Sequence, residues 1–148
     1  MADPNPTDFR NDAGTGTIQS DGFIGAIGAT TPAAGAFTYA RQSVSDALTA
    51  VGTNRATSLA LVSAINVVAT AASGTGVTLP AAATVGIGGI ITVYNYGANP
   101  IQVYAAGSET IDGAAAATGV PLANAKRCLY TCTTALKFIS AQLGVVSA

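Results

Sequence analysis

Few residues of this 148-residue chain carry side chains suited to acid–base chemistry. Histidine is absent, and after residue 47 the only carboxylates are Glu109 and Asp112. Paired carboxylates can act as general acid and base when a cleft shifts their pKa values. Asp112 is followed directly by Gly113, however, and Asp-Gly is typical of a tight turn in which the glycine takes positive φ. We therefore interpret the pair as structural and predict that the chain is not an enzyme.

Two cysteines, Cys128 and Cys132, could in principle bond to each other or bind a metal. If their segment is a strand, the two side chains share a face about 13 Å apart, at ~3.3 Å per residue, which is too far for a disulfide. Two cysteines without histidine also fall short of a zinc site. We predict free thiols that pack as small hydrophobic side chains.

Two groups of glycines, at positions 14 and 16 and at positions 86, 88 and 89, could suggest a phosphate-binding loop. Neither group is followed by the Gly-Lys-Ser/Thr that such a loop needs, so we interpret them as flexible joints. The sequence predicts no cofactor and no metal.

The chain is poor in charge. Charged residues make up 9% and hydrophobic residues 49% of it, whereas about 25% charge is typical of a soluble domain. Every apolar run is interrupted before the roughly 18 residues that a membrane span needs, so no membrane partner is expected. A chain of this kind has to bury or share its surface, as an obligate oligomer or as a subunit docked on a larger assembly. A monomer solubilised by Thr, Ser and Asn remains the alternative.

Charge is also distributed unevenly. The acidic residues before position 47 outnumber Arg10 and Arg41; they are Asp3, Asp8, Asp12, Asp21 and Asp46. The remainder is mildly basic, but its basic residues are too few and too scattered to line a groove that binds a phosphate backbone. Nucleic acid is therefore not an expected partner. The first residues show neither the basic nor the apolar region of a secretory signal, which predicts synthesis in a cytoplasm.

Residues 1–40 are rich in Pro, Gly, Thr, Asn and Asp and carry only isolated apolar side chains. Such a segment cannot offset its ordering entropy alone, so we predict an extended N-terminal arm that orders against a neighbour. The expected anchors at this protein interface are Phe9, Phe23, Ile24, Ile27 and Phe37. The alternative is that residues 17–26 form the first strand or two of the domain that follows.

Residues 41–148 break into short β-favouring runs separated by turn residues, which is typical of an all-β sandwich. The short strands and connections leave little room for parallel crossovers, and we therefore predict an antiparallel β-sandwich or jelly-roll-like domain. Residues 43–52 fit a short helix or an edge strand, and both alternatives stay open. The last two runs, 126–133 and 136–140, predict a hairpin. In it Cys128, Tyr130 and Cys132 lie on one face, and because both faces are largely apolar, we expect both to be buried.

Residues 27–38, Ile-Gly-Ala-Thr-Thr-Pro-Ala-Ala-Gly-Ala-Phe-Thr, resemble a peptide that recurs near the front of tailed-phage structural proteins, above all fibre and head-decoration subunits. Segments 50–57, 76–81, 91–99, 101–104 and 110–113 resemble, in that order, a small phage virion module. Such modules often carry tryptophan in the last hairpin, where this chain has Phe138. The resemblance implies a homotrimeric all-β module, anchored by its N-terminal segment to the major capsid protein.

The resulting hypothesis is a bacteriophage capsid decoration or cement protein. It would assemble in the host cytoplasm, reside on the outer surface of the virion capsid and stabilise the shell. The alternative is a head or tail fibre module that binds a host receptor or glycan. For that role the sequence offers Tyr94, Tyr96, Tyr104 and the alanine-rich loop 112–118.

Overall fold

The computed structural model describes residues 41–144, which form ten strands and one four-residue helix. The predicted all-β class is confirmed. The elements are β1 (Val44–Ala50), β2 (Leu59–Ala60), β3 (Ile65–Ala71), β4 (Gly76–Thr78), α1 (Ala82–Val85), β5 (Ile90–Asn95), β6 (Ile101–Tyr104), β7 (Thr110–Ile111), β8 (Val120–Leu122), β9 (Lys126–Thr134) and β10 (Lys137–Leu143).

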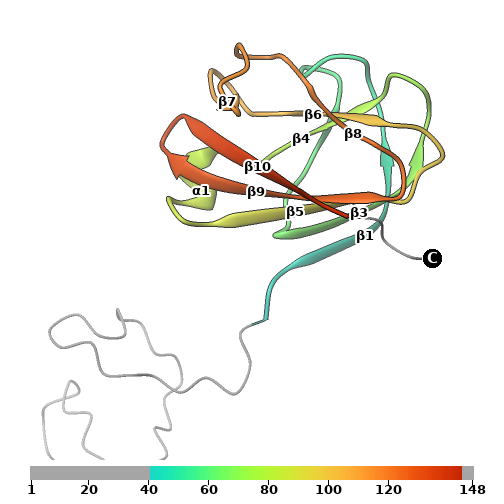
Figure 1. Cartoon of the computed structure of the whole chain (residues 1–148), viewed down its shortest axis with the longest axis horizontal. Coiled ribbons are helices and arrows are strands. Elements are labelled where there is room, and N and C mark those ends of the chain that lie inside the picture. Colours follow the sequence, from blue (N-terminus) through green and yellow to red (C-terminus); the bar gives the residue numbers. More distant parts are fainter. Residues whose placement is uncertain (1–40, 145–148) are drawn as a thin grey trace, which may run out of the picture. The chain divides into compact units, whose positions relative to one another are not determined.

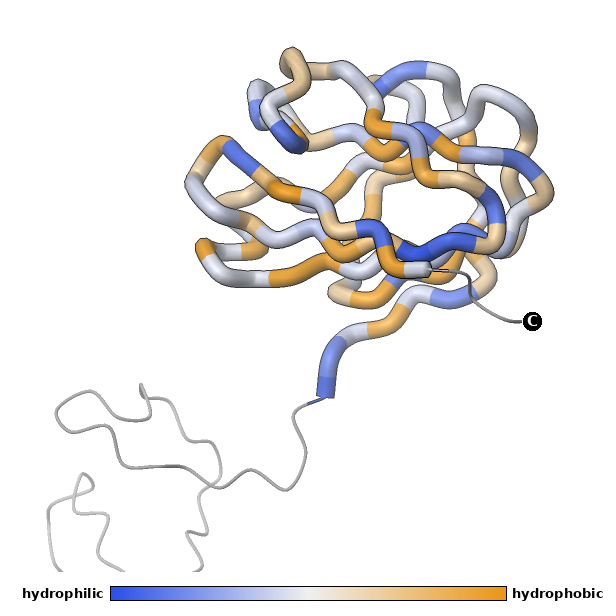
Figure 2. The backbone as a smooth tube through the Cα atoms, in the orientation of Figure 1, coloured by the Kyte–Doolittle hydropathy of each residue, from blue (hydrophilic) through white to orange (hydrophobic). Residues whose placement is uncertain are grey.

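The strands form two sheets. The larger has six strands in the order β1-β3-β5-β9-β10-β7, and the smaller has four in the order β2-β4-β6-β8. In Figure 1, β4, β6 and β8 run above β3, β5 and β9. Hydrophobic positions recur along the strands of the six-stranded sheet (Figure 2).

The expectation of antiparallel sheets is wrong, because both sheets are mixed. Five of the eight strand pairings are parallel (β1 with β3, β3 with β5, β2 with β4, β4 with β6, β7 with β10). From β1 to β6 the chain alternates between the two sheets, so a strand of one sheet serves as the crossover between parallel neighbours in the other. Short connections exclude a helical crossover. They do not exclude a crossover made by a strand.

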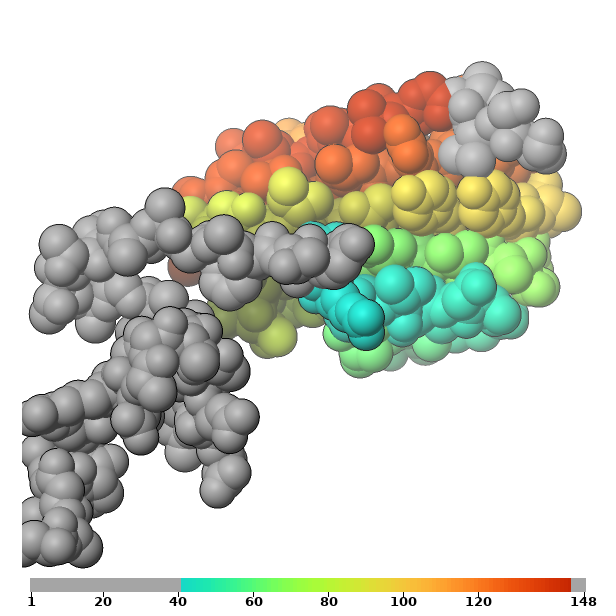
Figure 3. Space-filling view, turned by 90° about the horizontal axis from the view of Figure 1, so that it is seen from below, coloured from blue at the N-terminus to red at the C-terminus, as the bar shows by residue number. Residues whose placement is uncertain are grey.

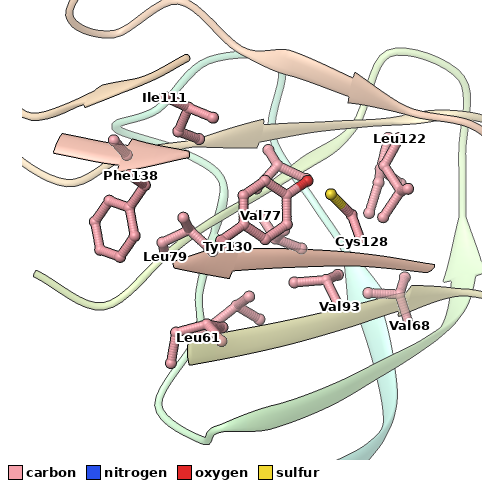
Figure 4. Close-up of a cluster of buried hydrophobic side chains, with 14 of the residues drawn as sticks. Leu61, Val68, Val77, Leu79, Val93, Ile111, Leu122, Cys128, Tyr130 and Phe138 are labelled. Atoms are coloured by element: carbon pink, nitrogen blue, oxygen red, sulfur yellow. The ribbon is translucent and has the colours of Figure 1, made fainter. Parts of the chain in front are cut away.

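Side chains from both sheets fill one core (Figure 4). Val68, Val93 and Tyr130 come from the six-stranded sheet, and Val77 and Leu122 from the four-stranded one. Each of these side chains is at most 1% exposed. The alternation along each strand therefore directs one set of apolar residues into the space between the sheets.

The buried side chain of Asn95 holds the turn between β5 and β6. The Asn95 amide donates hydrogen bonds to the carbonyls of Asn99 (3.0 Å) and Leu122 (3.2 Å), and its Oδ1 accepts one from the Gly97 N–H (3.0 Å). Glycine is required at position 97, because a Cβ there would lie 2.5 Å from the Ala71 Cβ. The turn is thereby tied to both β3 and β8.

The predictions for single segments agree with the structure better than the predicted antiparallel pairing of the strands does. Residues 44–50 are β1, at one edge of the six-stranded sheet, so the helix alternative is wrong. This strand is irregular around Ala47, whose φ is +55°. The predicted hairpin is confirmed as β9 and β10, paired antiparallel. As expected, Cys128, Tyr130 and Cys132 share the buried face of β9.

Candidate protein-binding site

The two carboxylates considered for catalysis are both engaged in structural hydrogen bonds. Glu109 is 7% exposed, and its Oε1 accepts a hydrogen bond from the Ala82 N–H at the start of α1 (2.8 Å). Asp112 accepts from the backbone N–H of Ser140 (2.7 Å) and from its hydroxyl (2.5 Å). Gly113 has the predicted positive φ, +78°. Both carboxylates thus link the loops around β7 to other parts of the fold.

Both cysteines are free and buried, as predicted. Burial raises the pKa of the Cys128 thiol, which disfavours the nucleophilic thiolate. Within residues 41–144, no cluster of three or more metal-binding side chains occurs. No helix in that part of the chain is long and apolar enough to cross a membrane.

The three tyrosines considered for receptor binding do not share one surface. Tyr104 is 5% exposed, and its hydroxyl donates a hydrogen bond to the Thr53 carbonyl (3.2 Å). Tyr94 and Tyr96 instead stack on each other, with ring centroids 6.0 Å apart and planes 12° apart. Tyr96 is 48% exposed. Of these three tyrosines, only the stacked pair could meet a ligand, and the loop 112–118 is also largely exposed.

The five predicted anchors, Phe9, Phe23, Ile24, Ile27 and Phe37, lie outside the described residues, as does the whole predicted arm. A binding surface within residues 41–144 has to be sought on the sheets themselves.

One such surface is the side of the six-stranded sheet that faces away from the core, which we call the outer face. Strand register places its residues in three rows across the sheet. Figure 3 shows this side of the domain, with β1, β3, β5, β9 and β10 next to one another. The rows are Ile90, Thr131 and Ile139; Val44, Ile65, Thr92, Leu129 and Ala141; and Val67, Tyr94, Arg127 and Leu143.

Large apolar side chains on the outer face are exposed. Val44 is 59% exposed, Ile139 45%, Ile90 41% and Leu143 38%. The expectation that both faces of the last hairpin are buried is therefore wrong for residues 41–144, because no described element covers this side. A contiguous apolar surface of this kind commonly marks a binding site.

Arg127, in the third row, is the one charged residue in the three rows of the outer face. Its guanidinium carbon lies 5.9 Å from the centroid of the Tyr94 ring, at cation–π distance. Arg127 forms no ion pair and no side-chain hydrogen bond with any residue from 41 to 144. Tyrosine and arginine are enriched, and charged residues otherwise depleted, in the cores of protein interfaces. The composition of the outer face thus indicates a protein-binding site.

Comparison of the chain with protein-family models, with curated proteins and with solved structures gives no match in any of the three. Functional inference therefore rests on the fold, on the outer face and on the sequence features described above.

The outer face is a functional candidate that the sequence did not reveal directly. The sequence does indicate it indirectly, because both sides of β9 are apolar: Leu129 lies on one side, and Cys128 and Tyr130 lie on the other. Alternation alone cannot tell which side another element covers, because that depends on the order of strands in both sheets.

Proposed function

We propose that the chain is a virion structural protein that binds the major capsid protein on the outer surface of a phage capsid and stabilises the shell. The single observation that carries this proposal is the exposed, apolar outer face on a chain with only 9% charged residues. A surface of this kind needs a partner. The resemblance of residues 27–38 to phage head-decoration subunits supports the same class of partner.

Two further parts of the proposal concern architecture. The single core shared by two sheets supports a sandwich-type module, although its sheets are mixed. A homotrimer follows from the resemblance to virion modules, and the low charge content is compatible with buried contacts between copies.

The mechanism we propose is thermodynamic. A protein that binds the assembled shell, but not its separate subunits, shifts the equilibrium toward the shell by mass action. Two linked contacts, one by the arm of residues 1–40 and one by the folded domain, raise the avidity well above that of either contact alone. The arm anchors would be Phe9, Phe23, Ile24, Ile27 and Phe37.

The stacked tyrosines favour a second candidate, a head or tail fibre module that binds a host receptor or glycan. Stacked aromatic rings on a sheet surface could pack against a ligand, but Tyr104 cannot contribute because it is buried. The pair also lies beside Arg127 within a larger apolar surface. A protein partner fits that surface better than a small glycan does, because the middle row of the outer face extends across five strands.

Cosedimentation tests the proposal. Purified full-length protein, and a version lacking residues 1–40, are mixed with undecorated shells assembled from the major capsid protein encoded in the same genome. We expect the full-length protein to pellet in stoichiometric amounts and the truncated protein to bind much more weakly. If neither version binds the shells and the full-length protein adheres to host cells or glycans, the fibre function replaces the proposed one.

A further inference from the structure

We propose that the outer face of the six-stranded sheet is the surface by which the domain docks onto an apolar, acidic protein surface, with Arg127 receiving a partner carboxylate. This inference rests on the proposed function, in which the acidic surface belongs to the capsid. It adds which side of the domain faces the shell and which chemistry the shell presents there.

The size of the outer face suits one part of a two-part attachment. Five strands about 4.8 Å apart, each about 23 Å long, give a face of roughly 450 Å² in plan. A stable protein–protein interface needs about 800 Å² on each partner. The outer face thus provides about half of the area, and a second contact of the same chain has to provide the rest.

The surroundings of Arg127 suit a carboxylate. Its neighbours across the sheet are Tyr94 on β5 and Leu143 on β10. A guanidinium presents a planar pair of donors that matches both oxygens of a carboxylate. The neighbouring middle row, which includes Leu129 and Ala141, would exclude water from one side of the contact, which strengthens the ion pair. Because Arg127 has no acidic partner among residues 41–144, its charge remains to be matched from outside.

Charge complementarity favours a foreign acidic surface over a second copy of the outer face. Lys137, two residues before Ile139 on β10, adds a second positive charge to this side. Among the described strands, the one acidic residue is Asp46, two residues after Val44 on the edge strand β1, and its carboxylate accepts the Ala47 N–H. The outer side thus carries two positive charges, Arg127 and Lys137, against one negative charge, and two outer faces packed together would bring surfaces of net positive charge close to each other.

The experiment compares shell binding by full-length variants that add or reverse charge. Ile139→Glu places a carboxylate in the outer face. Leu136→Glu is its matched control, because Leu136 lies in the turn of the same hairpin and is 58% exposed against 45% for Ile139. Arg127→Glu reverses the charge at this position, and Arg127→Lys retains it without the planar fork.

We expect Ile139→Glu and Arg127→Glu each to weaken shell binding about tenfold or more, as substitutions at interface hot spots do. Leu136→Glu should stay within about twofold of the parent protein, and Arg127→Lys should fall between. Circular dichroism and urea unfolding establish that each variant is folded. A photo-crosslinking residue at position 139, but not at 136, should then attach to the major capsid protein.

Three outcomes overturn the inference. If the parent protein binds shells and both outer-face variants bind equally well, another surface docks and the proposed function still stands. If the parent protein does not bind shells at all, both the inference and the proposed function fail. If the outer-face variants convert an oligomer into a monomer and leave shell binding intact, a second copy covers the outer face.

Discussion

The carboxylate of Asp112 holds the backbone and the hydroxyl of Ser140 at the same time, through hydrogen bonds of 2.7 and 2.5 Å. Asp112 adopts positive φ (+53°) to do so, immediately after β7. The backbone N–H of Asp112 also donates a hydrogen bond to the Phe138 carbonyl (3.0 Å), so the side chain extends the parallel pairing of β7 with β10 to Ser140.

Asp112→Ala should lower the free energy of unfolding by about 1–3 kcal/mol. Both hydrogen bonds are lost, at about 0.5–1.5 kcal/mol each, and alanine is strained at positive φ. Urea unfolding followed by circular dichroism measures the change. Asp112→Asn is the matched control, since it keeps one acceptor oxygen and tolerates positive φ, and it should cost clearly less. Equal losses for the two variants would show that the acceptor and the φ preference do not matter.

Gly97→Ala should destabilise the domain by about 1–3 kcal/mol, the usual cost of overpacking. The new methyl group would lie 2.5 Å from the Ala71 Cβ and 2.7 Å from its backbone nitrogen, so β3 or the turn has to shift. Thermal unfolding reports the loss. Gly144→Ala is the control, because nothing lies within 4 Å of a Cβ there. A Gly97→Ala protein as stable as the parent would contradict the close approach of these backbones.

Stability should fall as the pH rises above about 10. Burial raises the pKa of Tyr130 well above its ordinary value of 10.0, so the folded protein keeps this proton after the unfolded chain has released it. The stabilising contribution is therefore complete below pH 10 and is lost as the pH rises toward the folded pKa. Unfolding midpoints between pH 8 and 11 measure this loss.

Tyr130→Phe provides the matched control for that titration, since it keeps the buried ring and removes the ionisable hydroxyl. Its unfolding midpoint should depend less on pH above 10 than that of the parent protein. An identical pH dependence in both proteins would assign the alkaline loss to other groups, among which Cys128 is the nearest, with a pKa raised above 9.0.

Both thiols should resist modification in the folded protein. Cys128 and Cys132 are 1% and 0% exposed, and reagents reach a buried thiol only after local or global opening. A chromogenic disulfide reagent at pH 8 should therefore titrate both thiols in urea and react slowly without it. Fast reaction of either thiol in the native protein would contradict its burial.

The sequence predicted the features of the fold that depend on residues close together in the chain, such as turns and the C-terminal hairpin. The positive φ of Gly113 was predicted because Asp-Gly is typical of a tight turn. The hairpin of β9 and β10 followed from two apolar runs with a short connection. Strand partners were not predictable in this way. β3 pairs with β1 and β5, and in each case a strand of the other sheet intervenes in the chain.

For the candidate site, too, local features were predictable from the sequence and the arrangement of the sheets was not. Tyr94 and Tyr104 look alike as tyrosines in short strands, yet one lies on the outer face and the other is buried against Thr53. Which side of a strand meets solvent depends on how the two sheets stack, and no local pattern encodes that. The apolar character of both sides of β9 indicated a buried surface, but not which partner would bury it.

The alternation of β1 to β6 between the two sheets has a consequence for how the chain folds. No two of these strands that follow one another in the chain pair directly, so each new pairing closes a loop that contains a whole strand of the other sheet. Loop closure of this kind is slow, and domains dominated by distant pairings fold in milliseconds to seconds. Only β9 and β10 can pair through a local turn. We therefore expect the domain to fold slowly, with the hairpin of β9 and β10 forming before β1 to β6 pair. Stopped-flow refolding of variants in the hairpin and in β1 would reveal that order.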